Sequence, residues 1–160
     1  MRKGLLPVIA ILCLLLLAAC GGSEPKPPIS DTPFGVGETA VFKDLKFTAL
    51  RVQESFGDQF WKPDEGKVFV GVEFLIENIS DKDYSISSLM MFTAYADGFA
   101  VSFSLSAEVF FGDTLGGTIS PGKKLQGYYA LEVPANWQEI EIQIIPELFS
   151  TSKAVFVFNK

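Results

Sequence analysis

The sequence predicts an all-β protein, with a single β-sandwich of about 7–8 short strands after a signal peptide and a flexible linker. Between Lys67 and Ser88 the apolar residues stand two positions apart and leave one face of an extended chain, whereas Glu73 and Glu77 leave the other. Similar apolar runs recur with turn-forming residues between them, and Asp97-Gly98 is the strongest hairpin signal. The strand that begins at Lys67 is therefore expected at the centre of the sandwich.

The first 19 residues have the pattern of a secretion signal. Arg2 and Lys3 precede an uncharged apolar run from Leu5 to Leu17, and small residues follow it. The run has about 13 residues, whereas a helix needs about 20 to cross the hydrocarbon core of a bilayer. A cleaved signal over residues 1–19 is therefore favoured over a permanent membrane span.

The end of this signal predicts a lipid anchor. Leu17-Ala18-Ala19-Cys20 resembles the bacterial lipobox, which implies that the Cys20 thiol receives a diacylglyceryl group and that a peptidase cuts just before it. Two acyl chains, at about 0.8 kcal/mol per buried methylene, hold a protein stably on a membrane. We expect a lipoprotein on the extracytoplasmic face of the cell membrane. The alternative is an ordinary cleavage site that happens to carry a cysteine.

Cysteine content and charge exclude several classes of protein. Cys13 leaves with the signal and Cys20 is acylated, so the mature chain has no thiol for a disulfide. Loss of Arg2 and Lys3 reduces the 13 basic residues to 11 against 19 acidic ones, a net charge of −8. Such a surface repels nucleic acid and anionic lipid headgroups.

The rest of the chain divides into a linker and one domain. Residues 20–37 carry Pro25, Pro27, Pro28 and Pro33 and read as a semi-rigid tether, and residues 38–160 read as the sandwich. Only Ser104–Phe111 is ambiguous between strand and helix. The predicted strands are Thr39–Lys43, Leu45–Glu54, Lys67–Ile79, Leu89–Ala96, Phe99–Leu105, Lys123–Val133, Glu139–Pro146 and Lys153–Asn159.

Several short motifs, in order, carry a family resemblance. They are Gly37-Glu38-Thr39, Pro63-Asp64-Glu65-Gly66-Lys67, Glu77-Asn78-Ile79-Ser80-Asp81-Lys82, Asp97-Gly98, Pro121-Gly122-Lys123 and Glu132-Val133-Pro134. From about Gly35 to Lys160 the chain resembles a bacterial lipoprotein domain of unknown function in the immunoprotective extracellular, immunoglobulin-like superfamily. The resemblance implies an immunoglobulin-like β-sandwich on a secreted or lipid-anchored protein, without an established catalytic activity.

The sequence offers little for catalysis, and we predict no catalytic residue, metal site or cofactor. The absence of histidine excludes a Ser-His-Asp triad, a Cys-His pair and a His-bearing zinc site. Gly117–Lys123 matches the start of a phosphate-binding loop, but Lys124 follows where Ser or Thr is needed, and a strand follows instead of a helix. Three carboxylate pairs read as solvated turns: Asp64 with Glu65, Asp81 with Asp83, and Glu139 with Glu141.

Aromatic residues remain as candidates for recognition. Phe56, Phe60 and Trp61 lie among polar residues after a predicted strand, and aromatics in loops often anchor protein contacts. Alternatively, Phe60 and Trp61 fold back to close one end of the sandwich. A second cluster, Phe103, Phe110 and Phe111, has the same two interpretations.

Two classes of function stay open. The first is a non-enzymatic, surface-displayed binding or structural module with a protein partner, which an anchor, a tether and the absence of catalytic groups favour. The second is a small-ligand or ion binder that delivers cargo to a membrane partner, or a carboxylate-based hydrolase. A concave pocket with two inward carboxylates would favour the second class, and a closed sandwich would favour the first.

Overall fold

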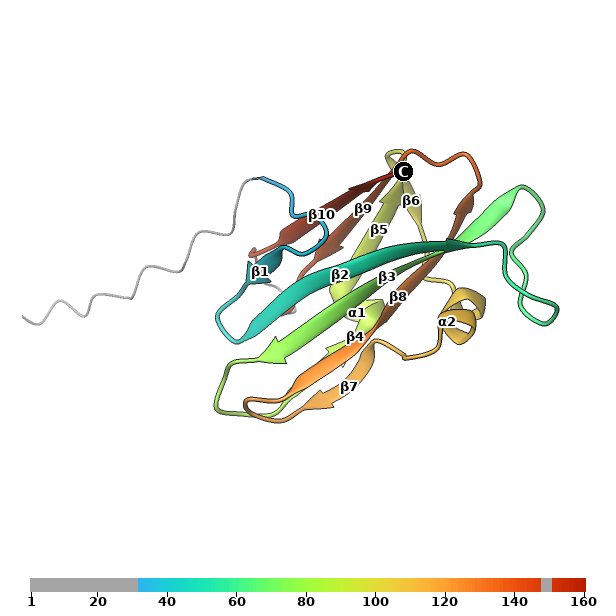
Figure 1. Ribbon diagram of the computed structural model, residues 1–160. Coiled ribbons are helices and arrows are strands. Elements are labelled where there is room, and N and C mark those ends of the chain that lie inside the picture. Colours follow the sequence, from blue (N-terminus) through green and yellow to red (C-terminus); the bar gives the residue numbers. More distant parts are fainter. Residues whose placement is uncertain (1–31, 148–150) are drawn as a thin grey trace, which may run out of the picture.

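The protein folds as a β-sandwich, which confirms the predicted fold class (Figure 1). The structure is a computed structural model that describes residues 32–147 and 151–160. Cys20 and the predicted signal lie outside the described residues. None of the helices in this part of the chain is long and apolar enough to span a membrane.

Ten strands and two short helices follow one another along the described residues. In order they are β1 (Thr39–Val41), β2 (Leu45–Ser55), β3 (Lys67–Asn78), β4 (Tyr84–Ser87), α1 (Ser88–Met91), β5 (Phe92–Ala96), β6 (Phe99–Val101), α2 (Leu105–Phe111), β7 (Gly116–Ile119), β8 (Lys124–Pro134), β9 (Glu139–Ile144) and β10 (Ala154–Asn159). One sheet has the strand order β1-β2-β3-β8 and the other β10-β9-β5-β6, while β4 and β7 form a two-stranded ribbon. Neighbouring strands pair antiparallel throughout.

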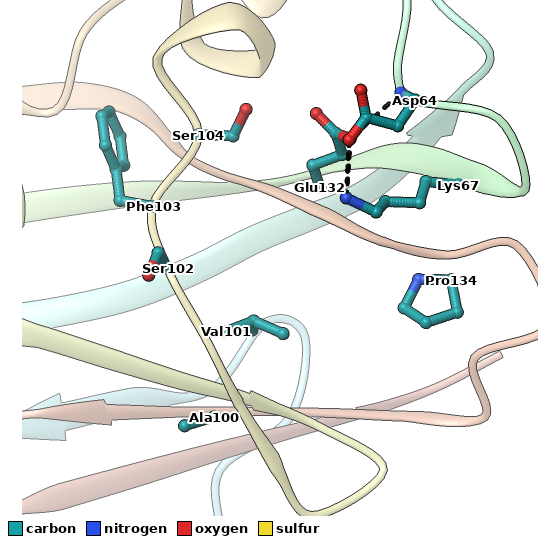
Figure 2. Close-up of a pocket in the computed structure, with 9 residues that line it drawn as sticks. All are labelled: Asp64, Lys67, Ala100, Val101, Ser102, Phe103, Ser104, Glu132 and Pro134. Atoms are coloured by element: carbon teal, nitrogen blue, oxygen red, sulfur yellow. Dashed lines mark hydrogen bonds and ion pairs between the residues drawn. The ribbon is translucent and has the colours of Figure 1, made fainter.

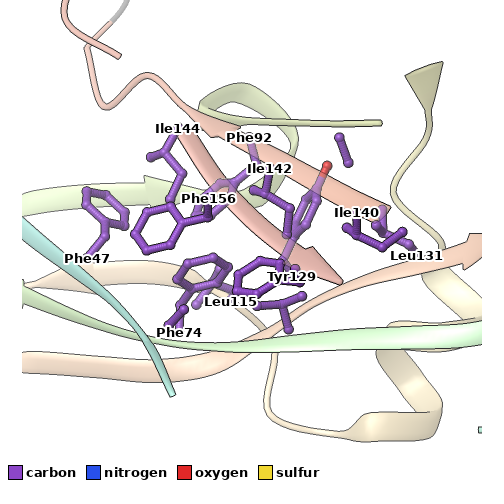
Figure 3. Packing of buried hydrophobic residues seen from close by; sticks show 14 of the residues in the cluster. Phe47, Phe74, Phe92, Leu115, Tyr129, Leu131, Ile140, Ile142, Ile144 and Phe156 are labelled. Atoms are coloured by element: carbon purple, nitrogen blue, oxygen red, sulfur yellow. The ribbon is translucent and has the colours of Figure 1, made fainter. Parts of the chain in front are cut away.

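The core lies between the two four-stranded sheets and is rich in aromatic rings (Figure 3). As the alternation predicts, Val68, Val70, Val72, Phe74 and Ile76 of β3 are fully buried. The Phe74 ring meets the rings of Phe92 and Phe156 edge-on, with centroids 5.6 and 5.3 Å apart. Such aromatic pairs contribute about 0.5–1.5 kcal/mol beyond the burial of their area. Packing of this kind holds the two sheets together.

The local structure corrects the prediction in two places and settles the one ambiguous segment. The expected strand from Leu89 starts as the helical turn α1, and β5 begins at Phe92. Strands β4 and β7 were not expected, because each has four residues and β7 opens with Gly116-Gly117, whereas glycine is depleted in strands. The ambiguous Ser104–Phe111 segment forms α2 and its N-cap.

The sandwich has two ends with different connections. At one end, which we call the tether end, the chain enters beside β10, where the Phe34 N–H donates to the Val155 carbonyl at 2.8 Å. Phe34 lies within the predicted linker, so the fold includes residues before Glu38. At the opposite end, the loop end, β2 passes into β3 (Figure 1). The 11 residues of β2 span about 36 Å between the two ends.

Candidate functional site

The connection between β2 and β3 presents aromatic side chains to solvent at the loop end. We call residues Ser55–Lys62 the aromatic loop. Phe56, Phe60 and Trp61 in it are 72, 77 and 40% exposed. Exposed aromatic surface contributes little to folding, because the hydrophobic effect rewards only area that leaves water. These three side chains are therefore available for contact with another molecule.

The backbone of the aromatic loop is held by one carboxylate. Asp58 Oδ1 accepts hydrogen bonds from the N–H groups of Phe60 and Trp61 at 2.7 and 2.8 Å. The Asp58 N–H donates to the Trp61 carbonyl at 2.8 Å. The bonds from Trp61 and Phe60 hold the pKa of the Asp58 carboxyl below its usual value, so the acceptor stays charged at neutral pH. The exposed side chains of Phe60 and Trp61 thus project from a backbone that these hydrogen bonds already order.

Gly57 makes this turn possible. Its φ of 75° lies in the left-handed region, which side chains other than glycine rarely adopt. A Cβ at Gly57 would lie 2.0 Å from the Trp61 carbonyl oxygen, so any other residue would push the two arms of the loop apart. The Gly57 N–H is satisfied by Ser55 Oγ at 3.1 Å. The sequence Ser-Phe-Gly-Asp therefore specifies one loop conformation.

A different tryptophan closes the loop end of the core. Trp137 is only 3% exposed, and its Nε1–H donates to Glu54 Oε2 at 2.6 Å. The Lys160 ammonium lies 5.3 Å from the centre of the Trp137 ring and 2.7 Å from the same Glu54 oxygen. Lys160 and Trp137 lower the pKa of the Glu54 carboxyl. The interpretation in which Phe60 and Trp61 close this end is wrong, because both side chains are exposed and the buried Trp137 fills it instead.

The second aromatic cluster packs on the sheet. Phe110 and Phe111 of α2 are half-buried, and the Phe111 ring stacks on Tyr128 with centroids 5.2 Å apart. Phe110 lies 5.8 Å from Phe69 of β3, measured between ring centres. Phe103, the third member, packs beside Tyr129 at the edge of the core. These rings attach α2 and its flanking chain to the sandwich.

Glycine on the outer face of the sheet makes room for α2. A Cβ at Gly71 would meet the Phe111 ring at 2.7 Å, and a Cβ at Gly127 would meet the Asp113 carbonyl oxygen at 2.6 Å. Glu108 of α2 lies in this contact and is 7% exposed, and its Oε1 has no hydrogen-bond partner among residues 32–147 and 151–160. Burial raises the pKa of the Glu108 carboxyl. The α2 contact therefore contains one unpaired acid.

A pocket of about 470 Å³ opens at the loop end, where β6 and the chain that follows it pass the outer face of β3 and β8 (Figure 2). The chain Ala100–Ser104, which includes the end of β6, forms one wall, and Asp64, Lys67, Glu132 and Pro134 form the other. Lys67 Nζ lies 2.8 Å from Asp64 Oδ2 and 3.3 Å from Glu132 Oε1. The pocket thus holds two carboxylates and one ammonium group.

These charges favour ion pairing over metal binding. Lys67 lowers the pKa of the Asp64 carboxyl, and the two carboxylates raise the pKa of Lys67. A lysine between two acids repels a divalent cation. Among residues 32–147 and 151–160, no three His, Cys, Asp or Glu side chains gather closely enough to hold a metal ion.

Sequence reasoning located only part of this surface. The sequence pairs Asp64 with Glu65, whereas in the structure Asp64 contacts Lys67 at the start of β3 and, through its backbone N–H, Glu132 near the end of β8. The register that sets Lys67 opposite Pro134 brings Glu132 into the pocket, and no local pattern reveals that register. The other two carboxylate pairs, Asp81 with Asp83 and Glu139 with Glu141, do not line the pocket.

Comparison with known proteins gives the family. The sequence profile of the domain of unknown function DUF4352 matches residues 34–155. The chain belongs to the DUF4352 family. The matched residues include the strands of both sheets up to the start of β10. No curated protein matches the chain.

Several solved bacterial proteins have a similar fold. A "putative lipoprotein", ycdA of Bacillus subtilis, has a TM-score of 0.60 and 17% identity, and the match covers 72% of this chain and 36% of that one. This chain therefore spans about a third of that lipoprotein. The yjhA protein of Bacillus subtilis has a TM-score of 0.56 and 23% identity over 79% of this chain and 98% of its own. An uncharacterized β-sandwich protein of Clostridium difficile has a TM-score of 0.53 and 17% identity over 85% of this chain and 100% of its own. At these identities the likeness concerns the fold.

Proposed function

We propose that this DUF4352 protein is a non-enzymatic binding module, held on the extracytoplasmic face of the cell membrane by a lipid on Cys20, that contacts a partner protein through its aromatic loop. The observation that carries the proposal is the pair of exposed rings, Phe60 and Trp61, on a backbone fixed by Asp58. Aromatic residues dominate the binding energy of protein interfaces, and a pre-ordered loop lowers the entropy lost on binding.

The arrangement of the two ends supports display of this loop. The tether joins the sandwich beside Val155, whereas the aromatic loop lies at the other end of β2 (Figure 1). An anchor at Cys20 therefore attaches to the end of the domain opposite the aromatic loop. The resemblance to immunoglobulin-like lipoprotein domains and the fold likeness to a "putative lipoprotein" are both in keeping with this placement.

Photo-crosslinking in cells tests the binding surface. A photoreactive residue at position 60 should capture a specific partner. The same residue at position 109 of α2, where Val109 is 48% exposed, serves as the matched control and should capture little. Equal capture at the two positions, or no capture at position 60, would refute the proposal.

The anchor is tested separately by membrane fractionation. Cys20→Ala should release the protein from membranes and abolish lipid labelling. Continued partition of the variant into membranes with unchanged labelling would exclude Cys20 as the lipid site.

A second candidate is a binder of small cationic ligands. The pocket with Asp64 and Glu132 in one wall is the observation that favours it. Titration calorimetry with putrescine and with Ca²⁺ as probes separates the candidates. Binding of putrescine that Glu132→Gln abolishes would favour the small-ligand binder, whereas the binding-module proposal expects no heat from either probe.

A further inference from the structure

The wall of the pocket that β6 provides is a free sheet edge. The hairpin between β5 and β6 turns through Asp97 and Gly98, with φ values of 49° and 81°, as in a tight primed turn. Ala96 and Phe99 close this hairpin and are therefore the first hydrogen-bonded pair. Since such pairs alternate, the next pair, Tyr95 with Ala100, exchanges no ladder hydrogen bonds.

The backbone N–H and C=O groups of Ala100 therefore make no ladder hydrogen bonds to β5. Both groups point away from β5, and β6 has no second neighbour in its sheet among the described strands. Phe99 and Ala100 are exposed, and β6 itself contains no charged residue or proline. Uncovered edges of this kind pair readily with an added strand.

The opposite wall supplies a charge preference. Asp64 and Glu132 carry two negative charges, and Lys67 balances one of them. The chain as a whole has a net charge of −6. A cationic side chain that enters the pocket would complete an arrangement of two positive and two negative groups, whereas an anionic one would add a third negative charge.

Together these features specify a partner segment. We propose that an extended segment of the partner protein pairs with the outer edge of β6 at Ala100 and places a lysine or arginine side chain in the pocket against Asp64 and Glu132. The inference rests on the proposed protein-binding function and adds the chemistry of the segment that is recognised. The aromatic loop leads directly into this wall, since only Lys62 and Pro63 separate Trp61 from Asp64.

Selection from a displayed library of random linear peptides, with the full-length protein in detergent as bait, tests this proposal. Enriched peptides should share a basic residue between residues of high β-propensity. Ala100→Pro removes the outward N–H at an edge position where proline is tolerated, and it should weaken peptide binding at least tenfold. The matched control Ala100→Val keeps the N–H and should stay within twofold. Absence of enriched peptides, or equal binding to the proline variant, would overturn the proposal.

Charge variants test the pocket itself. Glu132→Gln should weaken a selected peptide at least tenfold, whereas Lys67→Gln should strengthen it severalfold, because it leaves both carboxylates unbalanced. Stronger peptide binding by Glu132→Gln together with weaker binding by Lys67→Gln would indicate an anionic ligand and overturn the proposal. N-methylation of alternate backbone amides of the peptide removes its donors without a change in the protein and should abolish binding. Retained binding of the methylated peptide would also overturn strand pairing.

The outcomes separate the two proposals. Capture of a partner at position 60 that persists in Ala100→Pro would overturn strand pairing and leave the binding module in place. No capture at position 60, together with peptides that depend on Ala100 and Glu132, would refute the aromatic loop as the binding surface and support the pocket.

Discussion

The aromatic loop and α2 carry similar aromatic residues but use them differently. Phe60 of the loop is exposed, whereas Phe111 of α2 lies over Gly71 and stacks on Tyr128. The surface beneath each segment accounts for the difference. Glycine under α2 leaves space into which a ring can sink, whereas Trp137 already fills the end of the core near the loop. The exposure of an aromatic residue is thus set by the strand beneath it as much as by its own segment.

The largest effect on stability is expected from a substitution at Phe69, which lies beneath α2. Phe69 is fully buried on the outer face of β3 and contacts Phe110. Phe69→Ala should lower the free energy of unfolding by about 3–5 kcal/mol, because a large buried side chain leaves a cavity. Urea denaturation measures this change. A loss below about 1 kcal/mol would show that α2 contributes little to the fold.

A smaller loss is expected for the half-buried ring of α2. Phe111→Ala removes the stacking on Tyr128 and part of the buried area, so the free energy of unfolding should fall by about 2 kcal/mol. The same urea titration gives the value. If Phe111→Ala and Phe60→Ala were equally destabilising, the distinction between the two regions would fail.

The buried acid of α2 should make stability depend on pH. Because the pKa of Glu108 is raised in the folded state, the folded protein binds this proton more tightly than the unfolded chain does. The stabilisation is complete below the ordinary pKa of glutamate and is lost as pH rises through the raised folded pKa. Glu108→Gln should remove this pH-dependent loss of stability, because glutamine does not titrate. A buried polar atom without a hydrogen-bond partner lowers the free energy of unfolding by about 1–3 kcal/mol.

Thermal denaturation of wild type and Glu108→Gln between pH 4 and pH 8 checks this prediction, and no histidine titrates in that window. The wild type should lose stability relative to the variant as pH rises. Parallel curves for the two proteins would contradict the assignment of the pH dependence to Glu108.

The smallest effect on stability is expected in the aromatic loop. Phe60→Ala should change the free energy of unfolding by less than about 0.5 kcal/mol, since its ring is exposed. Crosslinking from position 56 to the partner should nevertheless decrease in this variant. A loss of more than about 2 kcal/mol would mean that the ring belongs to the core.

The sequence predicts the sandwich well where side chains alternate over many residues. Strands such as β3 and β8 carry apolar side chains at every second position on their core face, and this pattern of period two is visible without a structure. The burial of their outer face as well, for example at Phe69, depends on contacts that the pattern does not show. The short ribbon of β4 and β7 is different, because four-residue strands with Gly116-Gly117 carry too few side chains for a pattern. Its pairing depends on contacts between residues distant in the chain.

Helix α2 and the pocket are harder to predict from the sequence, and the reasons are physical. Helix α2 has seven residues, too few for a helical period, although Ser104 at its N-cap and Gly112 with φ of 77° at its C-cap are local signals that could have indicated it. The pocket joins Lys67 and Glu132 through strand register. The exposure of Phe60 follows from the position of Trp137, which the sequence does not indicate.

Amide hydrogen exchange of the aromatic loop tests the central claim most directly, namely that exposed rings stand on an ordered backbone. The N–H groups of Phe60 and Trp61 should exchange at least tenfold more slowly than in an unstructured chain, because both donate to Asp58. Asp58→Asn retains an acceptor oxygen and should keep most of this protection, whereas Asp58→Ala should lose it. Exchange at the unstructured rate in the wild type would contradict the account.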